Sequence, residues 1–177
     1  MKTSIRTDAE PMAFTADETW AGGFWSWLTF VGLMLVALLV SLAVPIATSP
    51  TPGALLAESF GWWVLILGFA LVLGGGISLI VMFCCLPIVA LIARALRRVD
   101  RIPVHIAVYA LLGASIGVVA VLVATLVRDG TGRAYIVEES PVPFLTVVIC
   151  AVSPVVGWWR ASRAARRERA SRASSTV

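Results

Sequence analysis

Charged residues are absent from four long stretches of this chain. These uncharged stretches are 21–57, 59–93, 102–127 and 140–159. Each contains an apolar run close to the roughly 20 residues with which a helix crosses a hydrocarbon core of ~30 Å. A backbone in hydrocarbon must satisfy its own hydrogen bonds, and a helix does so within one segment. The pattern therefore predicts an all-α, polytopic membrane protein with four transmembrane helices in an antiparallel bundle.

Prolines, glycines and polar clusters set the expected ends of these helices. The first run, for example, stops at Pro45 and the turn-forming residues that follow it, because proline and glycine disfavour a continued helix. The predicted helices are 24–46, 62–86, 104–127 and 143–159, within a transmembrane domain that covers 23–159. On either side we expect a polar, loosely ordered N-terminal tail over 1–22 and a basic C-terminal tail over 160–177.

The second uncharged stretch is longer than one membrane crossing needs. Residues 61–97 would rise roughly 55 Å as one helix, at ~1.5 Å per residue. Pro87 lies about two-thirds of the way along, so we expect a kink there, followed by a short interfacial amphipathic helix over 88–99. The alternative is a helix pair broken at Gly74, Gly75 and Gly76, whose first arm would be too short to span the bilayer.

Composition excludes a soluble domain and a cleaved signal peptide. Of the 177 residues, 59% are hydrophobic and 14% are charged, with a mean hydropathy of +0.94, whereas a soluble domain needs more charge at its surface. The segment before the first run carries four carboxylates against two basic residues, and the run exceeds the 7–15 residues of a signal sequence. Arginine outnumbers lysine 13 to 1, which favours a bacterial source.

Basic residues predict the orientation of the bundle. With four crossings, both tails and the middle connection lie on one side, and this side carries 12 of the 14 lysines and arginines. Basic flanks stay in the cytoplasm, so both termini should be cytoplasmic in a multi-pass protein of the plasma membrane. All seven tryptophans fall near predicted helix ends, as expected for indole rings at the headgroup level.

The apolar runs contain no residue set that predicts catalysis. No Asp, Glu, Lys or Arg lies within them, which argues against an ion-coupled transporter. His105 is the only histidine, so it has no second histidine with which to bind a metal, and we expect it at the interface. The cysteines Cys84, Cys85 and Cys150 lie within apolar runs and should act as small hydrophobes. We therefore predict no catalytic, cofactor-binding or metal site, and no enzyme.

Small residues and arginines supply the candidate contacts. Small residues let helices approach closely in lipid, and the predicted helix-packing residues are Gly74, Gly75, Gly76, Gly113 and Gly117. They should join the helices 62–86 and 104–127 to each other, or alternatively form a homodimer. Arginines next to a membrane attract anionic headgroups. The predicted anionic-lipid contacts are Arg94, Arg97, Arg98, Arg160, Arg163, Arg166 and Arg167.

Two functional hypotheses follow from this pattern. The first is a non-enzymatic structural or accessory subunit of a membrane complex, with a homo-oligomer or a larger assembly as the partner. The alternative is a small channel or permease for a neutral or lipophilic solute, gated near Gly74–Gly76. Nucleic acid is not an expected partner, because no aromatic residue follows Trp159 among the arginines of the tail. No cofactor is expected under either hypothesis.

Overall fold

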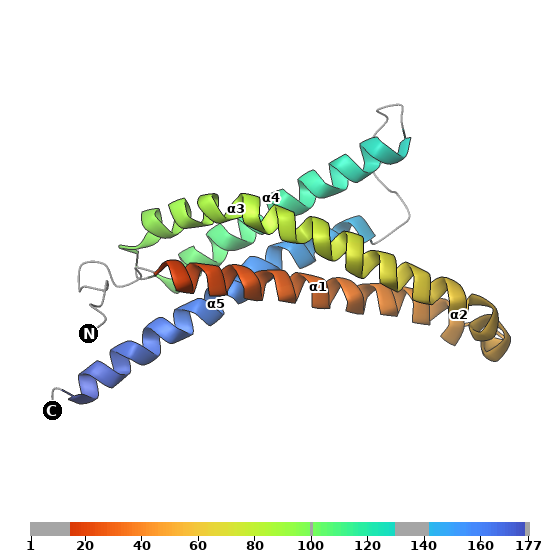
Figure 1. The fold of residues 1–177 in the computed structure, drawn as a ribbon, viewed down its shortest axis with the longest axis horizontal. Helices are drawn as coiled ribbons and strands as arrows, with labels where there is room; N and C mark the ends of the chain where they lie inside the picture. The colour runs from red at the N-terminus through yellow and green to blue at the C-terminus, as the bar shows by residue number, and fades with distance from the viewer. Residues whose placement is uncertain (1–14, 100, 130–141, 176–177) are drawn as a thin grey trace.

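The computed structural model describes residues 15–99, 101–129 and 142–175, and these residues form helices and short turns without a strand among them (Figure 1). The elements are α1 (Ala16–Ala47), α2 (Pro52–Phe69), η1 (Ala70–Gly74), α3 (Gly75–Leu96), α4 (Ile102–Asp129) and α5 (Val142–Ser175), where η1 is a π-helical turn between α2 and α3.

Four segments of the described chain are long and apolar enough to cross a membrane. They are Ala16–Ala47, Ser59–Leu96, Ile102–Val127 and Val142–Arg163. The second of them runs through α2, η1 and α3. Very few side chains are buried inside the protein, so most of the apolar surface faces outward. The prediction of an all-α polytopic membrane bundle is confirmed, and the chain is a multi-pass membrane protein.

α1 begins earlier than predicted, at Ala16 instead of residue 24. The Thr15 hydroxyl accepts a hydrogen bond from the Glu18 N–H, and the Glu18 carboxylate accepts one from the Thr15 N–H. This reciprocal pair is a capping box, which satisfies backbone donors at a helix start. Residues 16–22 therefore belong to α1 and not to a loosely ordered tail. The remainder of that predicted tail, 1–14, lies outside the described residues.

The helix of the second span passes through both positions where we expected a change. Pro87 lies inside α3, which continues to Leu96, so residues 88–96 do not form a separate helix. The alternative break at Gly74–Gly76 is also absent, because η1 widens one turn and leads directly into α3. A proline removes one backbone donor, whereas a break in an apolar setting would leave several groups unpaired. Continuation therefore costs less than interruption.

α5 extends past the predicted end at residue 159 and reaches Ser175. Only its first part, Val142–Arg163, is apolar enough to cross a membrane. Beyond this part the sequence is rich in alanine, arginine and glutamate, which have high helix propensity. No proline or glycine follows to stop the helix. The basic tail is therefore a continuation of the last span.

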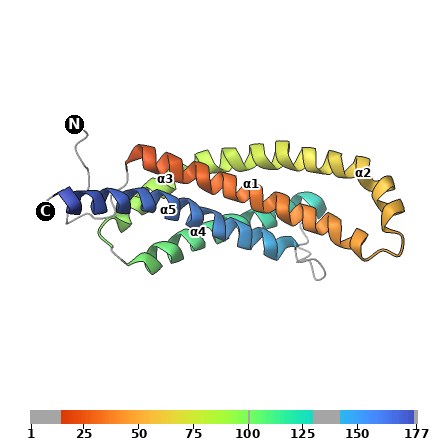
Figure 2. The same ribbon diagram turned by 90° about the horizontal axis from the view of Figure 1, so that it is seen from below.

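The helices pack in an order that differs from their order in the chain. α5 packs extensively against both α1 and α4, and α3 packs against α1. In the view of Figure 2 the helices follow one another as α3, α1, α5 and α4. The start of α1, the end of α5 and the connection between α3 and α4 all lie at one end of the bundle (Figure 1). Below we call this the arginine end.

Candidate functional site

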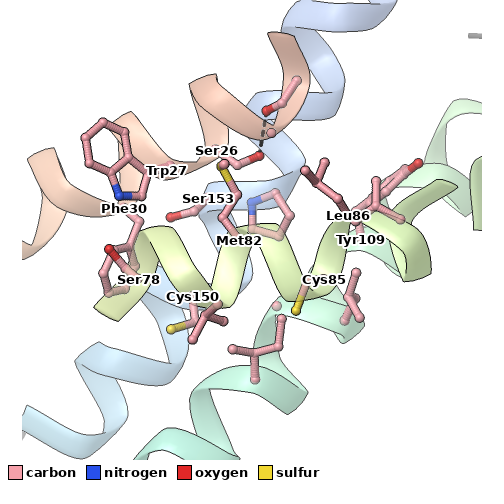
Figure 3. Close-up of a pocket in the computed structure, with 18 of the residues that line it drawn as sticks. Ser26, Trp27, Phe30, Ser78, Met82, Cys85, Leu86, Tyr109, Cys150 and Ser153 are labelled. Carbon is pink, nitrogen blue, oxygen red and sulfur yellow. Dashed lines mark hydrogen bonds between the residues drawn. The ribbon is translucent and has the colours of Figure 1, made fainter. Parts of the chain in front are cut away.

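A cavity of about 350 Å³ lies along the inner side of α3, where α3 faces α1, α4 and α5. Figure 3 shows the side chains around it. α3 lines the cavity from Ser78 through Met82, Cys85 and Val89 to Ala93. Residues three or four apart lie on one face of a helix, so these positions form a continuous wall. The cavity is therefore a long space beside α3 and not an isolated void.

The cavity exists because α3 and α4 are attached to different partners. The Trp27 indole on α1 donates a hydrogen bond of 3.1 Å to the Gly75 carbonyl at the start of α3. Further along, the rings of Trp20 and Phe83 meet edge to face, with centroids 5.5 Å apart. α4 packs against α5 instead, and α3 and α4 make no extensive contact with each other. The space between α3 and α4 is left for something else to fill.

The serines that line the cavity offer no free hydroxyl proton to a ligand. Ser26, Ser78 and Ser153 line the cavity, and each donates its hydroxyl proton to a backbone carbonyl of its own helix, at 2.9, 2.9 and 2.7 Å. These donors are therefore already satisfied. Sulfur atoms of Cys85 and Cys150 face the same region (Figure 3). A ligand here would meet a dry, polarisable surface.

An aromatic stack lies near the cavity at the arginine end. The Trp158 ring is stacked on His105, with centroids 5.2 Å apart, and on Tyr109, at 6.2 Å. His105 is 1% exposed and Trp158 is 5% exposed. The expectation of an interfacial His105 stays a prediction, but its ring is enclosed between helices and does not face outward. The His105 ring lies one turn inside α4, where Trp158 in the middle of α5 covers it.

The polar atoms of this stack are only partly satisfied. Nε2 of His105 lies 2.8 Å from the Val99 carbonyl oxygen, so it carries the proton and donates. Within the described chain, Nδ1 of His105 and Nε1 of Trp158 are buried without a hydrogen-bond partner. Trp27, by contrast, uses its N–H inside the bundle. Two of the tryptophans expected at the membrane surface thus serve contacts between helices.

Gly113 and Gly117 face α5, not the helix of residues 62–86. A Cβ at Gly113 would overlap the backbone carbonyl of Cys150 and come within 2.8 Å of a Pro154 ring carbon. A Cβ at Gly117 would lie 2.9 Å from the Val147 Cα. The glycines therefore permit close approach of two helices, as small residues do in membranes. The predicted partner was wrong, because α5 and not α3 supplies the matching face.

A second close contact, which sequence reasoning missed, joins α1 to α5. A Cβ at Gly157 would overlap both the Ser26 hydroxyl and the Gly22 carbonyl. Its signal is present in the sequence as Gly22-x-x-x-Ser26 and Ser153-x-x-x-Gly157, two pairs of small residues spaced by one helical turn. Such pairs identify a face that allows close approach, but they do not say which helix meets it.

The three consecutive glycines of the second span have different surroundings. A Cβ at Gly74 would lie 3.2 Å from the Met34 Cε, whereas Gly75 and Gly76 have open space at that position. Gly74 lines the cavity at the end away from the arginines. Gly75 contributes its carbonyl to Trp27 and Ser78. Within one copy of the chain, Gly75 and Gly76 are thus not points of close helix packing.

The predicted lipid-contacting arginines lie at the arginine end. Arg94, Arg98, Arg160, Arg163 and Arg167 are exposed, Arg97 is half-buried, and the side chain of Arg166 lies outside the described residues. The Arg160 guanidinium lies 3.9 Å from the centre of the Trp25 ring, and that of Arg163 lies 3.5 Å from the centre of the Trp159 ring. Both geometries are cation–π contacts, which fix the direction of the charged groups.

The comparisons with known proteins add no relative to this geometry. No protein-family model, no curated protein and no solved structure matches the chain significantly. What the fold defines is the class, a multi-pass membrane protein with four candidate spanning helices among the described residues. Any function must therefore be argued from the cavity and from the uncovered surface of the bundle.

Proposed function

We propose that this protein is a non-enzymatic membrane protein that binds a lipophilic solute in the cavity beside α3, as a small permease or carrier would. The cavity carries this proposal. Its volume of about 350 Å³ lies within the roughly 300–1,000 Å³ of small-molecule sites. Helices from three sides contribute to its wall, and the weak contact between α3 and α4 offers a lateral entrance from the lipid.

The wall chemistry favours binding over catalysis. The hydroxyls of Ser26, Ser78 and Ser153 donate to backbone carbonyls, so in this arrangement none is paired with a general base. A nucleophile needs such a base or a lowered pKa to react. An apolar wall with satisfied polar groups instead suits a neutral or lipophilic molecule. The π-helical turn η1, which ends at Gly74, adds a place where the helix can change its winding.

Filling the cavity tests this proposal. Ala120 on α4 lines the cavity, whereas its neighbour Val119 does not and is exposed. We expect Ala120→Phe to abolish the retention of lipophilic molecules by the purified protein in native mass spectrometry. Val119→Phe adds the same ring outside the cavity and should leave retention unchanged. Equal retention in both variants, or no retained molecule in the wild type, would contradict the proposal.

A second measurement separates a permease from a protein that only binds. Liposomes that contain the pure protein should release a trapped neutral solute or exchange a lipophilic probe faster than empty liposomes. The Ala120→Phe variant should be slower than Val119→Phe at equal protein density. If the liposomes stay tight while retention still depends on the cavity, the protein binds lipophilic molecules but does not transport them.

The second candidate function is that of an accessory subunit, and the length of the second span favours it. Ser59–Leu96 has 38 residues, which rise roughly 57 Å at ~1.5 Å per residue. Even a tilt of about 40° accounts for only ~39 Å of helix within a ~30 Å core. Trp62 and Val72 on this helix are 69% and 71% exposed. A second copy or another membrane protein would cover the excess.

Crosslinking tests the accessory function separately from the cavity. A cysteine placed at Val72 should form a disulfide-linked dimer or a defined crosslink to a partner in native membranes, if that face is covered by protein. Val127→Cys is the control, since Val127 is also strongly exposed but lies on α4. Crosslinking at both positions to the same extent, or at neither, would contradict a docking role for α2, η1 and α3.

A further inference from the structure

Charged residues lie close in sequence to the lining residues where the cavity reaches the arginine end. The wall formed by α3 ends at Ala93, and the next position on the same face, four residues on, is Arg97. On α4 the wall begins at Tyr109, and the same face leads back to His105, while Arg101 directly precedes the helix. The ends of α3 and α4 thus bring two basic residues to this end of the cavity.

α5 and α1 complete this opening with one charge of each sign. Arg160 directly precedes Ala161, and Ala161 lines the cavity. The Arg160 guanidinium lies over the Trp25 ring. Glu18 also lines the cavity, but its carboxylate accepts the N–H of Thr15 in the capping box. Arg97, Arg101 and Arg160 do not line the cavity themselves, but they lie at the same end of the bundle, where their positive charges attract an anionic group.

The cavity is longer than one leaflet is thick. Its wall along η1 and α3 extends from Gly74 to Ala93, roughly 28 Å at ~1.5 Å per residue. One leaflet contributes about half of a ~30 Å hydrocarbon core, so an acyl chain from the arginine end would reach beyond mid-membrane inside the protein. Met34 and Met82 line this path, and methionine side chains adapt to irregular apolar shapes.

We infer that the cavity holds one anionic phospholipid from the leaflet at the arginine end. One acyl chain enters between α3 and α4 and lies along the α3 wall, and the phosphate is held at the opening by Arg97 and Arg160. Arg101 adds positive charge at the same opening. The inference rests on the proposed binding function and adds the class of ligand and the position of its headgroup.

Charge complementarity is what distinguishes this occupant from the others. A helix from a second copy would bring apolar side chains and no group for the arginines. A free phosphate would use the arginines but leave the apolar wall empty. A neutral lipid would fill the wall without using the charges. An anionic amphiphile suits both parts of the cavity, because its chain packs against the apolar wall and its headgroup meets the arginines.

Matched arginine variants test the headgroup position. The protein would be delipidated in detergent and titrated with phosphatidylglycerol or with diacylglycerol, which has no phosphate, and bound lipid would be counted by native mass spectrometry. The double variant Arg97→Gln/Arg160→Gln should lose affinity for phosphatidylglycerol by roughly fivefold for each arginine and keep its affinity for diacylglycerol. Arg169→Gln/Arg172→Gln removes the same charge from the last part of α5, beyond Ala161 where the cavity lining ends, and should have little effect. A photoreactive group at the end of the acyl chain should label the cavity wall near Met34.

The outcomes separate this inference from the proposed function. If both lipids bind equally and both arginine pairs behave alike, while Ala120→Phe still removes binding, the anionic site is wrong and the lipophilic cavity stands. If neither lipid binds and Ala120→Phe changes nothing, both ideas fail. Binding of glycerol phosphate as tightly as the whole lipid would also overturn the inference, since the chain would then contribute nothing. An arginine variant that unfolds would be recognised by its circular dichroism, and lysine at the same two positions would then test the charge.

Discussion

α5 and α3 are both long helices of the bundle, but they are attached in different ways. α5 approaches α1 and α4 so closely that Gly157, Gly113 and Gly117 have no room for a Cβ. α3 is tied to α1 mainly through side chains such as Trp27, and it leaves a cavity on its other flank. Lipid is as apolar as leucine, so apolar character alone does not join helices in a membrane. Small residues on both partners decide which pairs close without a gap.

Gly113→Ala should have the largest effect on this difference. The new Cβ would overlap the backbone carbonyl of Cys150 and also approach Pro154, and neither group can rotate away. α4 and α5 would have to separate, so we expect a loss of about 3 kcal/mol in the free energy of unfolding, at the upper end for overpacked cores. Unfolding by sodium dodecyl sulfate in mixed micelles measures it. An unchanged midpoint would mean that α4 and α5 are not in backbone contact at this point.

Gly157→Ala should follow, with a loss of about 2 kcal/mol in the free energy of unfolding. Its Cβ would overlap the Ser26 hydroxyl, which can turn, and the Gly22 carbonyl, which cannot. Gly22→Ala is the matched control, because that Cβ would meet its nearest atoms at 3.5 Å, an ordinary contact. If the two variants were equally stable, the close approach of α1 and α5 at Gly157 would be wrong.

The topology of this bundle was predictable because charge is so unevenly placed along the chain. Uncharged stretches defined the four spans, and the structure contains them. The helix ends were less predictable, since they depend on local chemistry that hydropathy does not record. The capping box of Thr15 and Glu18 moved the start of α1, and Pro87 failed to end α3. An uncharged stretch predicts where the chain crosses the hydrocarbon core. The helix itself ends where its backbone groups find other hydrogen-bond partners.

The cavity was not predictable, because it depends on which helices pair. The sequence identified Gly113 and Gly117 as a close-packing face, but it assigned that face to the second span. Had α3 met α4 there, the space lined by Cys85 and Cys150 would have been closed. The matching face of α5 is formed by Val147, Cys150 and Pro154, which is no stripe of small residues. Only the three-dimensional arrangement selects α5 from several apolar helices of similar composition.

Trp27→Phe should have a smaller effect and should act on α3 alone. The change removes the hydrogen bond from the indole to the Gly75 carbonyl and keeps most of the aromatic surface. We expect a loss of about 1 kcal/mol, the usual net value for one hydrogen bond. Hydrogen exchange should become faster in α3 while α5 keeps its protection. Faster exchange in α5, or none in α3, would contradict a tie between α1 and α3 at this residue.

Gly76→Ala should have the smallest effect, and it should be stabilising. Nothing lies within 4 Å of the Cβ position, and alanine in a helix interior is favoured over glycine by up to about 1 kcal/mol. We therefore expect a rise of roughly 0.5 kcal/mol in the free energy of unfolding of the isolated protein. The same substitution has a second effect if this glycine face contacts another membrane protein. The added methyl group would then weaken the assembly, although the free energy of unfolding of the single copy would rise. A crosslinked assembly that survives Gly76→Ala would place the partner elsewhere on α2 and α3, whereas its loss would assign the open glycine face to a protein contact and leave the cavity on the opposite flank to lipid.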